Sequence, residues 1–250
     1  MVSLIDVQNL TKVYHLGETQ VNALSGVTLT IERGTFVAVM GPSGSGKSTF
    51  LNLLGCLDTP TSGRYLLDGF PVEGLDRDQL AEVRNQKIGF VFQNFNLLPR
   101  MSALENVQLP LLYTNSPAAD LDSPARVALA SVGLEGREYS LPTQLSGGQQ
   151  QRVAIARALI NNPEIVLADE PTGQLDSRTG AEIMGVFQRL NQQQGLTVVV
   201  VTHSDEVARF AHRVISFRDG LVVSDQQFLP SSSANSQNRV EHELPLEVAP

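Results

Sequence analysis

A glycine-rich segment at residues 41–49, GPSGSGKST, has the residue types and spacing of a phosphate-binding loop. Glycines let successive backbone N–H groups turn inward around phosphate oxygens, and a helix beginning at the end of the loop adds partial positive charge. The Lys47 ammonium can neutralise the β- and γ-phosphates of ATP, and the Ser48 hydroxyl can ligate Mg²⁺. The segment therefore predicts ATP and Mg²⁺ binding, with a plain glycine-rich turn as the alternative. The predicted binding residues are Gly41, Pro42, Ser43, Gly44, Ser45, Gly46, Lys47, Ser48 and Thr49.

Two adjacent carboxylates, Asp169 and Glu170, follow an apolar run, IVLA at residues 165–168. Carboxylates beside a core are costly unless they are paired or bound to a metal. Next to a phosphate-binding loop, the first acid is expected to serve Mg²⁺, here through water, and the second to polarise the water that attacks the γ-phosphate. The alternative is two solvated turn residues before Pro171.

Two more apolar runs end in residues that could join this chemistry. The run IGFVF at residues 88–92 leads into Gln93, and TVVVVT at residues 197–202 leads into His203. In open α/β sheets, ligands bind outside the carboxyl ends of the strands, so these side chains are expected at the same edge as the phosphate-binding loop. Gln93 could orient Mg²⁺ or water there, and His203 could reach the γ-phosphate; a purely structural role is the alternative for each.

The segment LSGGQ at residues 145–149 precedes a helical pattern, QQRVAIARALI. Ser146 and Gln149 have the spacing of a capping box. Gly147 and Gly148 cost up to ~1 kcal/mol each against alanine in a first helical turn, which is explained if bare backbone approaches an anion. We expect a second phosphate-binding helix start here, with a locally strained cap as the alternative.

The elements that must position these residues alternate between strands and helices. Short apolar runs rich in β-branched residues predict strands buried on both faces, at residues 36–40, 88–92, 165–168 and 198–201. Helix-compatible spacing follows at residues 47–57, 149–160 and 177–192. This alternation predicts a doubly wound α/β fold.

Two regions depart from that alternation. Shorter strands joined by turns are expected at residues 4–10, 21–24 and 27–31, as a small N-terminal antiparallel sheet. The strand signal disappears at about residues 94–158, where a capping-box pattern from Ser102 and a start at Ser123-Pro124, ended by Gly133, predict helices of an inserted subdomain. Residues 229–250 are polar and lack periodicity, which predicts a disordered tail, with a partner-docking peptide as the alternative.

Composition narrows the possible partners. Eighteen Lys and Arg against 26 Asp and Glu give a net charge of −8, which disfavours a nucleic-acid partner. Cys56 is the only cysteine, which rules out an internal disulfide and suits a buried apolar position. The N-terminus lacks the pattern of a secretory signal, and the apolar runs fall far short of the ~20 residues that span a bilayer. We therefore expect a soluble chain that serves any membrane process through a partner.

Together, these motifs resemble the ATP-binding cassette (ABC) family over residues 2–225. The matching elements are GPSGSGKST, Gln93, LSGGQ, LADEP, the segment at residues 174–176 and His203. The resemblance implies a P-loop NTPase (RecA-like) core with a small N-terminal antiparallel β subdomain and an inserted helical subdomain. The ABC ATPase domain is then expected at residues 1–228, with the helical part at about residues 94–158.

The resemblance also implies a role for each residue within one chain. Tyr14 would stack on the adenine, with an ordinary strand aromatic as the alternative. Gln93 would lie in the loop that couples the nucleotide to a membrane partner. Asp169 would serve Mg²⁺, Glu170 would be the catalytic base, and His203 would contact the γ-phosphate.

A second copy of the chain completes the site in the resembled family. The four residues Ser146, Gly147, Gly148 and Gln149 would contact the γ-phosphate of ATP held by the other copy, and Asp176 would help join the two. Residues 53–63 and 169–176 look like the lipoprotein-release and macrolide-export group, although Gln174 stands where that group usually has asparagine.

The implied function is an ATPase that dimerises on ATP and drives a separate membrane permease from the cytoplasmic face of the inner membrane. In the resembled group the cargo is hydrophobic, it is exported or released, and a periplasmic adaptor sometimes takes part. An alternative is that the same cycle signals across the membrane to cell-wall enzymes. A soluble cassette acting on ribosomes or DNA would carry tandem cassettes, a coiled-coil insertion or a basic stripe, and a small-molecule kinase has no use for LSGGQ.

Overall fold

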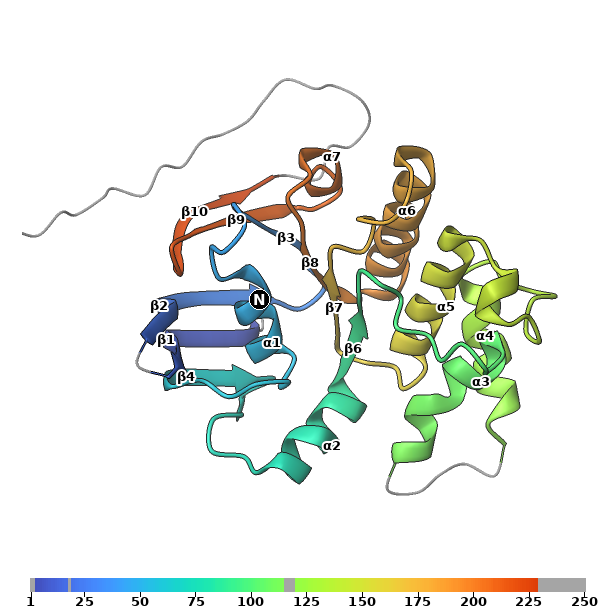
Figure 1. Ribbon diagram of the computed structural model, residues 1–250, viewed down its shortest axis with the longest axis horizontal. Coiled ribbons are helices and arrows are strands. Elements are labelled where there is room, and N and C mark those ends of the chain that lie inside the picture. Colours follow the sequence, from blue (N-terminus) through green and yellow to red (C-terminus); the bar gives the residue numbers. More distant parts are fainter. Residues whose placement is uncertain (1–2, 18, 115–119, 229–250) are drawn as a thin grey trace, which may run out of the picture.

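A computed structural model describes residues 3–17, 19–114 and 120–228. A mostly parallel sheet lies at the centre of the molecule (Figure 1). Its strands are β3 (Phe36–Met40), β6 (Ile88–Val91), β7 (Ile165–Asp169), β8 (Thr197–Val201), β9 (Arg213–Arg218) and β10 (Leu221–Gln227). They run in the order β10-β9-β3-β8-β7-β6, and β10 alone is antiparallel to its neighbour. The four predicted core strands are confirmed, with ends shifted by no more than one residue.

A second, antiparallel sheet contains the N-terminus. Its strands are β1 (Ser3–Leu16), β2 (Thr19–Glu32), β4 (Ser62–Leu67) and β5 (Phe70–Pro71), in the order β2-β1-β4-β5. The prediction of a break between strands at residues 21–24 and 27–31 is wrong, because β2 continues through both. Gly26 has φ +99° and falls at a register shift, where Leu10 pairs with Val27 but Thr11 pairs with Ser25. The residue pattern therefore marks a β-bulge, not a chain reversal.

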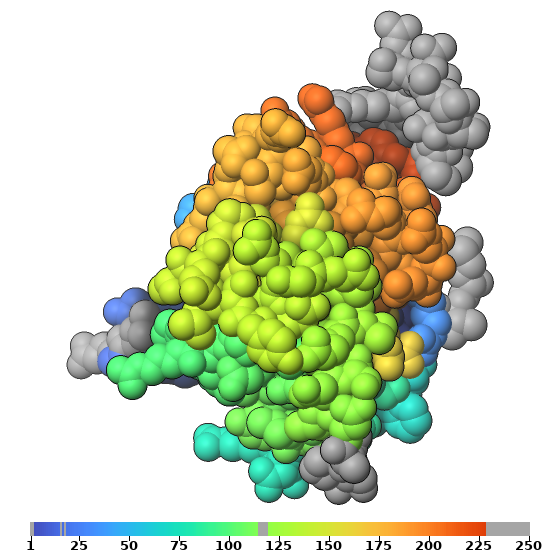
Figure 2. Space-filling model, turned by 90° about the vertical axis from the view of Figure 1, so that its right-hand side faces the viewer, coloured from blue at the N-terminus to red at the C-terminus, as the bar shows by residue number. Residues whose placement is uncertain are grey.

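Helices cover the central sheet and extend to one side of it. They are α1 (Lys47–Leu54), α2 (Arg77–Lys87), α3 (Ala103–Gln108), α4 (Asp122–Ser131), α5 (Gly147–Leu159), α6 (Ser177–Gln194) and α7 (Asp205–Ala208), with 3-10 turns η1 (Leu109–Tyr113) and η2 (Pro142–Gln144). Figure 1 shows α3, α4 and α5 together on the side of the central sheet away from β1, β2 and β4, and Figure 2 looks onto that green and yellow-green face. Every element in the described part of residues 94–158 is helical, as expected.

Capping side chains fix the starts of several of these helices. Ser102 accepts the amide N–H of Glu105 while the Glu105 carboxylate accepts that of Ser102, which confirms the predicted capping box before α3. Helix α4 begins one residue before the predicted Ser123-Pro124 start. None of the helices in the described ranges is both long and apolar enough to cross a membrane.

Two hydrophobic cores lie on opposite faces of the central sheet, because successive strand residues point to opposite sides. Ala38 and Val200 belong to the core that also contains residues of α5 and α6. Val39 and Val201 belong to the core that contains residues of α1 and the antiparallel sheet. With both faces buried, the sheet is rigid, and the chemistry falls to the loops at the ends of its strands.

Candidate active site

A cleft of about 580 Å³ opens at the edge of the central sheet where β3, β7 and β8 end. The residues that line it come from these strand ends and from β2. They are Val21, Asn22, Ala23, Gly41, Pro42, Ser43, Gly44, Ser45, Gly46, Lys47, Ser48, Thr49, Asp169, Glu170, Val201 and His203. Three of the four predicted strand ends therefore meet in one place, and the fourth, Gln93, is not among the lining residues.

The loop after β3 needs glycine for space as well as for conformation. Gly41 and Gly46 have φ values of +145° and +99°. A Cβ on Gly41 would lie 2.2 Å from the carbonyl oxygen of Phe217, and one on Gly46 would lie 2.5 Å from that of Ala23. The loop is thus pressed against neighbouring backbone on one side, and its opposite side lines the cleft.

The polar groups of this loop fit an anion with several oxygens. Lys47 is 9% exposed, and its ammonium donates hydrogen bonds of 2.8 Å to the carbonyl oxygens of Gly41 and Pro42. The Ser45 hydroxyl is buried without a hydrogen-bond partner among the described residues. A nearly buried cation, an unsatisfied hydroxyl and a helix start at Lys47 together suit phosphate.

The two carboxylates at the end of β7 fit a divalent cation beside that phosphate. Burial raises the pKa of the Asp169 carboxyl, the neighbouring charge of Glu170 raises it further, and the Lys47 ammonium opposes the rise. A cation would stabilise both carboxylates, and the Ser48 hydroxyl lines the same cleft as a further oxygen ligand. The residues present therefore fit Mg²⁺.

Glu170 is held by side chains from the end of β8. Its Oε1 lies 2.7 Å from Nδ1 of His203, and its Oε2 accepts a 3.4 Å hydrogen bond from the Thr202 hydroxyl. The Thr202 oxygen also accepts the amide N–H of Ser204, whose own hydroxyl caps α7. Glu170 has φ +45°, a strained value for a residue other than glycine, which is typical of functional sites. Thr202 was missed in the sequence, where its position as the last residue of TVVVVT was the available signal.

Tyr14 lies beside the cleft without lining it. It pairs across the antiparallel sheet with Val21, which does line the cleft. Its hydroxyl donates to Asp58 at 2.8 Å, and the Lys12 ammonium lies 4.9 Å from the ring centroid. Burial raises the pKa of the Tyr14 hydroxyl, and the hydrogen bond to Asp58 raises it further. The ring is thus held in place at the rim of the cleft.

Gln93 faces the loop after β7. A Cβ on Gly173 would lie 2.7 Å from the Gln93 side-chain amide nitrogen. The next residues of the two loops are joined as well, because the Gln174 amide donates to the Asn94 side-chain oxygen. The longer side chain at position 174 therefore connects the loop after β6 to the loop after β7.

Residues 146–149 begin α5 and do not line the cleft. The predicted capping box is confirmed, since the Ser146 hydroxyl accepts the Gln149 amide N–H and the Gln149 side chain accepts that of Ser146. The glycines also have a reason inside the chain. A Cβ on Gly148 would lie 2.4 Å from Cγ2 of Thr179, so close packing on α6 requires glycine there. Asp176 caps α6, and its hydrogen bonds to Thr179 lower the pKa of its carboxyl.

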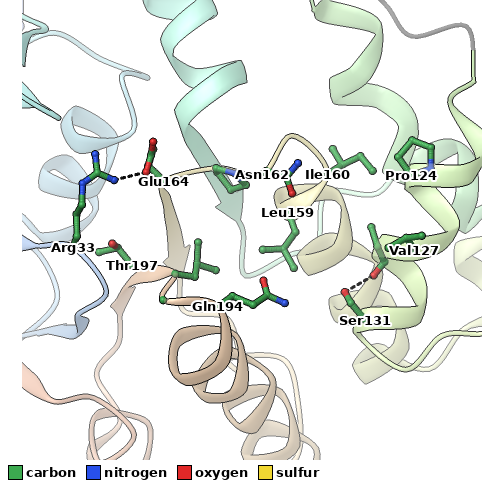
Figure 3. Close-up of a pocket in the computed structure, with 14 residues that line it drawn as sticks. Arg33, Pro124, Val127, Ser131, Leu159, Ile160, Asn162, Glu164, Gln194 and Thr197 are labelled. Atoms are coloured by element: carbon green, nitrogen blue, oxygen red, sulfur yellow. Dashed lines mark hydrogen bonds and ion pairs between the residues drawn. The ribbon is translucent and has the colours of Figure 1, made fainter.

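A second cavity, of about 570 Å³, lies at the other edge of the sheet, where β7 and β8 begin (Figure 3). Val127 of α4, Leu159 of α5 and Thr197 of β8 are among its lining residues. Its arginine, Arg33, is paired with Glu164 and with Asp68. The cavity shares no lining residue with the cleft, so the predicted chemistry is not divided between the two.

Comparison with known proteins agrees with this arrangement. The family model described as ABC transporter matches residues 24–173. The chain is 55% identical to a macrolide export ATP-binding/permease protein MacB from Syntrophobacter fumaroxidans, over 88% of this chain and 31% of that protein. It is 51% identical to an ABC transporter ATP-binding protein, MJ0796, from Methanocaldococcus jannaschii, over 90% of this chain and 97% of that one. The chain therefore spans about a third of the MacB relative and nearly all of the second.

The fold of this chain is also similar to that of the MJ0796 relative. A dimeric structure of the MJ0796 cassette, described as a post-hydrolysis state bound to ADP and Pi, matches with a TM-score of 0.83 and 50% identity, covering 91% of this chain and all of that one. A RecA-like core, an antiparallel sheet, a helical part and a phosphate-binding loop are all present. The chain belongs to the ABC transporter family, as an ATP-binding cassette with ATPase function.

Proposed function

We propose that two copies of this chain close around two molecules of ATP and that their hydrolysis drives a membrane permease. One observation carries the proposal. The cleft gathers Lys47, Asp169, Glu170 and His203 from one chain, whereas the glycine-containing start of α5 is not among its lining residues. A second copy would bring its own residues 146–149 to the open side of the cleft. The MJ0796 relative, whose structure is described as dimeric, supports this arrangement.

Each predicted site residue has a task in this proposal. Lys47 exchanges its two loop carbonyls for the β- and γ-phosphates, and backbone N–H groups of residues 43–49 donate to the phosphate oxygens. Tyr14 receives the adenine at the rim of the cleft. Ser48 and Asp169 would hold Mg²⁺, with Gln93 as the further ligand predicted from the sequence, and the ion would neutralise charge on the phosphates.

Glu170 acts as the base in the proposed hydrolysis. One carboxylate oxygen accepts a proton from the attacking water while the oxygen of that water forms the new bond to the γ-phosphorus and ADP leaves. The Thr202 hydroxyl donates to Oε2 and helps to orient the carboxylate, while Nδ1 of His203 contacts Oε1. His203 is largely exposed and can exchange this contact for the γ-phosphate, as the sequence resemblance implies.

The proposed work is export or release of hydrophobic cargo, with the cassette peripheral at the cytoplasmic face of the inner membrane. The support is the similarity to MacB relatives, named as macrolide export ATP-binding/permease proteins, which join ATP binding and a permease in one protein. The cassette here would serve such a permease, and a periplasmic adaptor would complete the assembly.

The test compares Glu170→Gln with the parent chain. The variant should retain ATP binding, form ATP-dependent dimers on size-exclusion chromatography, and release phosphate about 10²–10⁴ times more slowly, the usual effect of a general base. Glu135→Gln is a matched control, because Glu135 is an exposed acid that does not line the cleft and should keep normal turnover. Near-normal hydrolysis by Glu170→Gln removes Glu170 from the mechanism, and a monomer at saturating ATP contradicts the paired cassettes.

A further inference from the structure

The start of α5 packs against the loop after β7 within the same chain. Besides the contact of Gly148 with Thr179, a Cβ on Gly147 would lie 3.1 Å from Cδ2 of Leu175. One turn further along the helix, Nε2 of Gln151 donates to the carbonyl oxygen of Pro171 at 2.5 Å. The start of α5 and the loop that carries Glu170 are therefore packed against each other.

Gln151 is an unusual side chain for its position. It is 0% exposed, and its Oε1 has no hydrogen-bond partner among the described residues. A buried amide with one unsatisfied oxygen destabilises the fold compared with an apolar side chain of similar size. Packing alone therefore does not explain glutamine here, whereas its hydrogen bond to the Pro171 carbonyl does.

The carbonyl that Gln151 holds belongs to a loop constrained around the catalytic acid. The amide N–H of Glu170 donates to the Val201 carbonyl at 2.9 Å, and the Glu170 carbonyl accepts the amide N–H of Gly173 at 3.0 Å. By its hydrogen bond to the Pro171 carbonyl oxygen, Gln151 fixes the next peptide unit, between Pro171 and Thr172. Glu170 has a left-handed backbone conformation, which persists only when its surroundings hold it.

We propose that Gln151 is a positioning residue that links the two ATP sites of the dimer through one chain. This inference rests on the proposed function, in which residues 146–149 of a chain serve one ATP and Glu170 of the same chain serves the other. When the start of α5 engages the γ-phosphate at the first site, Gln151 transmits its position to the Pro171 carbonyl and so to the Glu170 carboxylate at the second. Hydrolysis at either site thereby depends on ATP at both.

The test removes the hydrogen bond from the Gln151 side chain to the Pro171 carbonyl oxygen. Gln151→Met keeps a similar length and packing but leaves the Pro171 carbonyl unpaired, and Gln151→Leu repeats the loss with a different shape. For both, we expect kcat to fall about tenfold, as for one lost positioning hydrogen bond, with KM for ATP unchanged. The Hill coefficient for ATP should fall from above 1 in the parent toward 1 in the variants.

Two controls separate positioning from general loss of structure. Gln150→Met changes the adjacent glutamine, whose side chain donates to Leu145 and not to the loop after β7. Asn191→Leu removes another buried side-chain amide, near the end of α6, which donates to the carbonyl oxygens of Gly34 and Leu196. Both should keep the parental kcat and Hill coefficient, even where urea unfolding shows a loss of stability.

The outcomes distinguish this inference from the function on which it rests. In a Glu170→Gln background, Gln151→Met should still form ATP-dependent dimers. If the Glu170→Gln parent fails to dimerise, the proposed function fails. If it dimerises, the inference is overturned by a parental Hill coefficient of 1, by unchanged kinetics in both Gln151 variants, or by an equal loss in the Asn191 control.

Discussion

At the scale of single residues, Cys56 shows how burial decides chemistry. Its side chain is 1% exposed in the core beneath the antiparallel sheet, and burial raises the pKa of its thiol to about 12. The thiolate is the reactive form of cysteine, so a raised pKa suppresses reaction at neutral and mildly alkaline pH. The prediction from sequence that Cys56 serves as a small buried apolar residue agrees with this environment.

Cys56 should therefore be inert in the folded protein. A chromogenic disulfide reagent should react slowly throughout pH 7 to pH 9, because only a minute fraction of the thiol is ionised below its pKa of about 12. In urea the same thiol should react rapidly, with a rate that rises through its ordinary pKa of about 8.5. Rapid reaction of the native chain at pH 8 would contradict the buried placement.

Sequence predicted the residues that stand at strand ends better than the residues that hold them. Asp169 and His203 follow apolar runs, and the position of ligand sites at the carboxyl ends of α/β sheet strands predicts that they lie together. Thr202 was overlooked although it ends the run TVVVVT, and Gln151 carries no such local mark. Their partners, Glu170 and Pro171, are 32 and 20 residues away in the chain, and only the packed fold shows these hydrogen bonds.

At the scale of elements, β6 and α5 approach each other closely at a glycine. A Cβ on Gly89 of β6 would lie 2.4 Å from the carbonyl oxygen of Ala158 and 3.1 Å from its Cβ. Since both atoms belong to Ala158 in the last full turn of α5, neither can move without shifting the helix. Gly89 thus sets the distance between the sheet and the helix that carries residues 147–149 at its other end.

Alanine at two glycines should therefore have opposite effects. Gly89→Ala should lower the free energy of unfolding by about 1–3 kcal/mol, the usual effect of overpacking. Gly185→Ala, inside α6, meets only the flexible Arg189 guanidinium at 3.8 Å and should raise it by about 0.5–1 kcal/mol through helix propensity. Urea unfolding of the two variants measures both values. A stabilising Gly89→Ala would show that β6 and α5 have room to separate.

Element boundaries were predictable where local chemistry sets them. Ser102 and Ser146 cap helices, and such starts follow from residue types three positions apart. The continuity of β2 did not follow, because Gly26 disrupts the residue pattern equally in a turn and in a bulge. The pairing with β1 decides between these two, and that pairing is a property of the sheet.

At the scale of the whole molecule, the two predicted phosphate-binding helix starts lie on different parts of the fold. Lys47 begins α1 in the cleft, and Ser146 caps α5, which packs among the helices on the other side of β6 and β7 (Figure 1). The residue motifs predicted both starts, and the family resemblance assigned them to different copies. In the proposed dimer, one chain would therefore offer half of each of two sites.

Complementation between two defective chains tests this division. Lys47→Ala removes the charge in the cleft, and Ser146→Arg blocks close approach of the α5 backbone to phosphate, so each variant alone forms dimers with two defective sites. A mixed dimer has one site with both defects and one site with neither. In a Glu170→Gln background, which stops turnover, mixing should therefore yield ATP-dependent dimers that hold one occluded nucleotide. Size-exclusion chromatography with nucleotide quantitation measures this, and a mixture that retains no more ATP than the separate variants would refute a shared site.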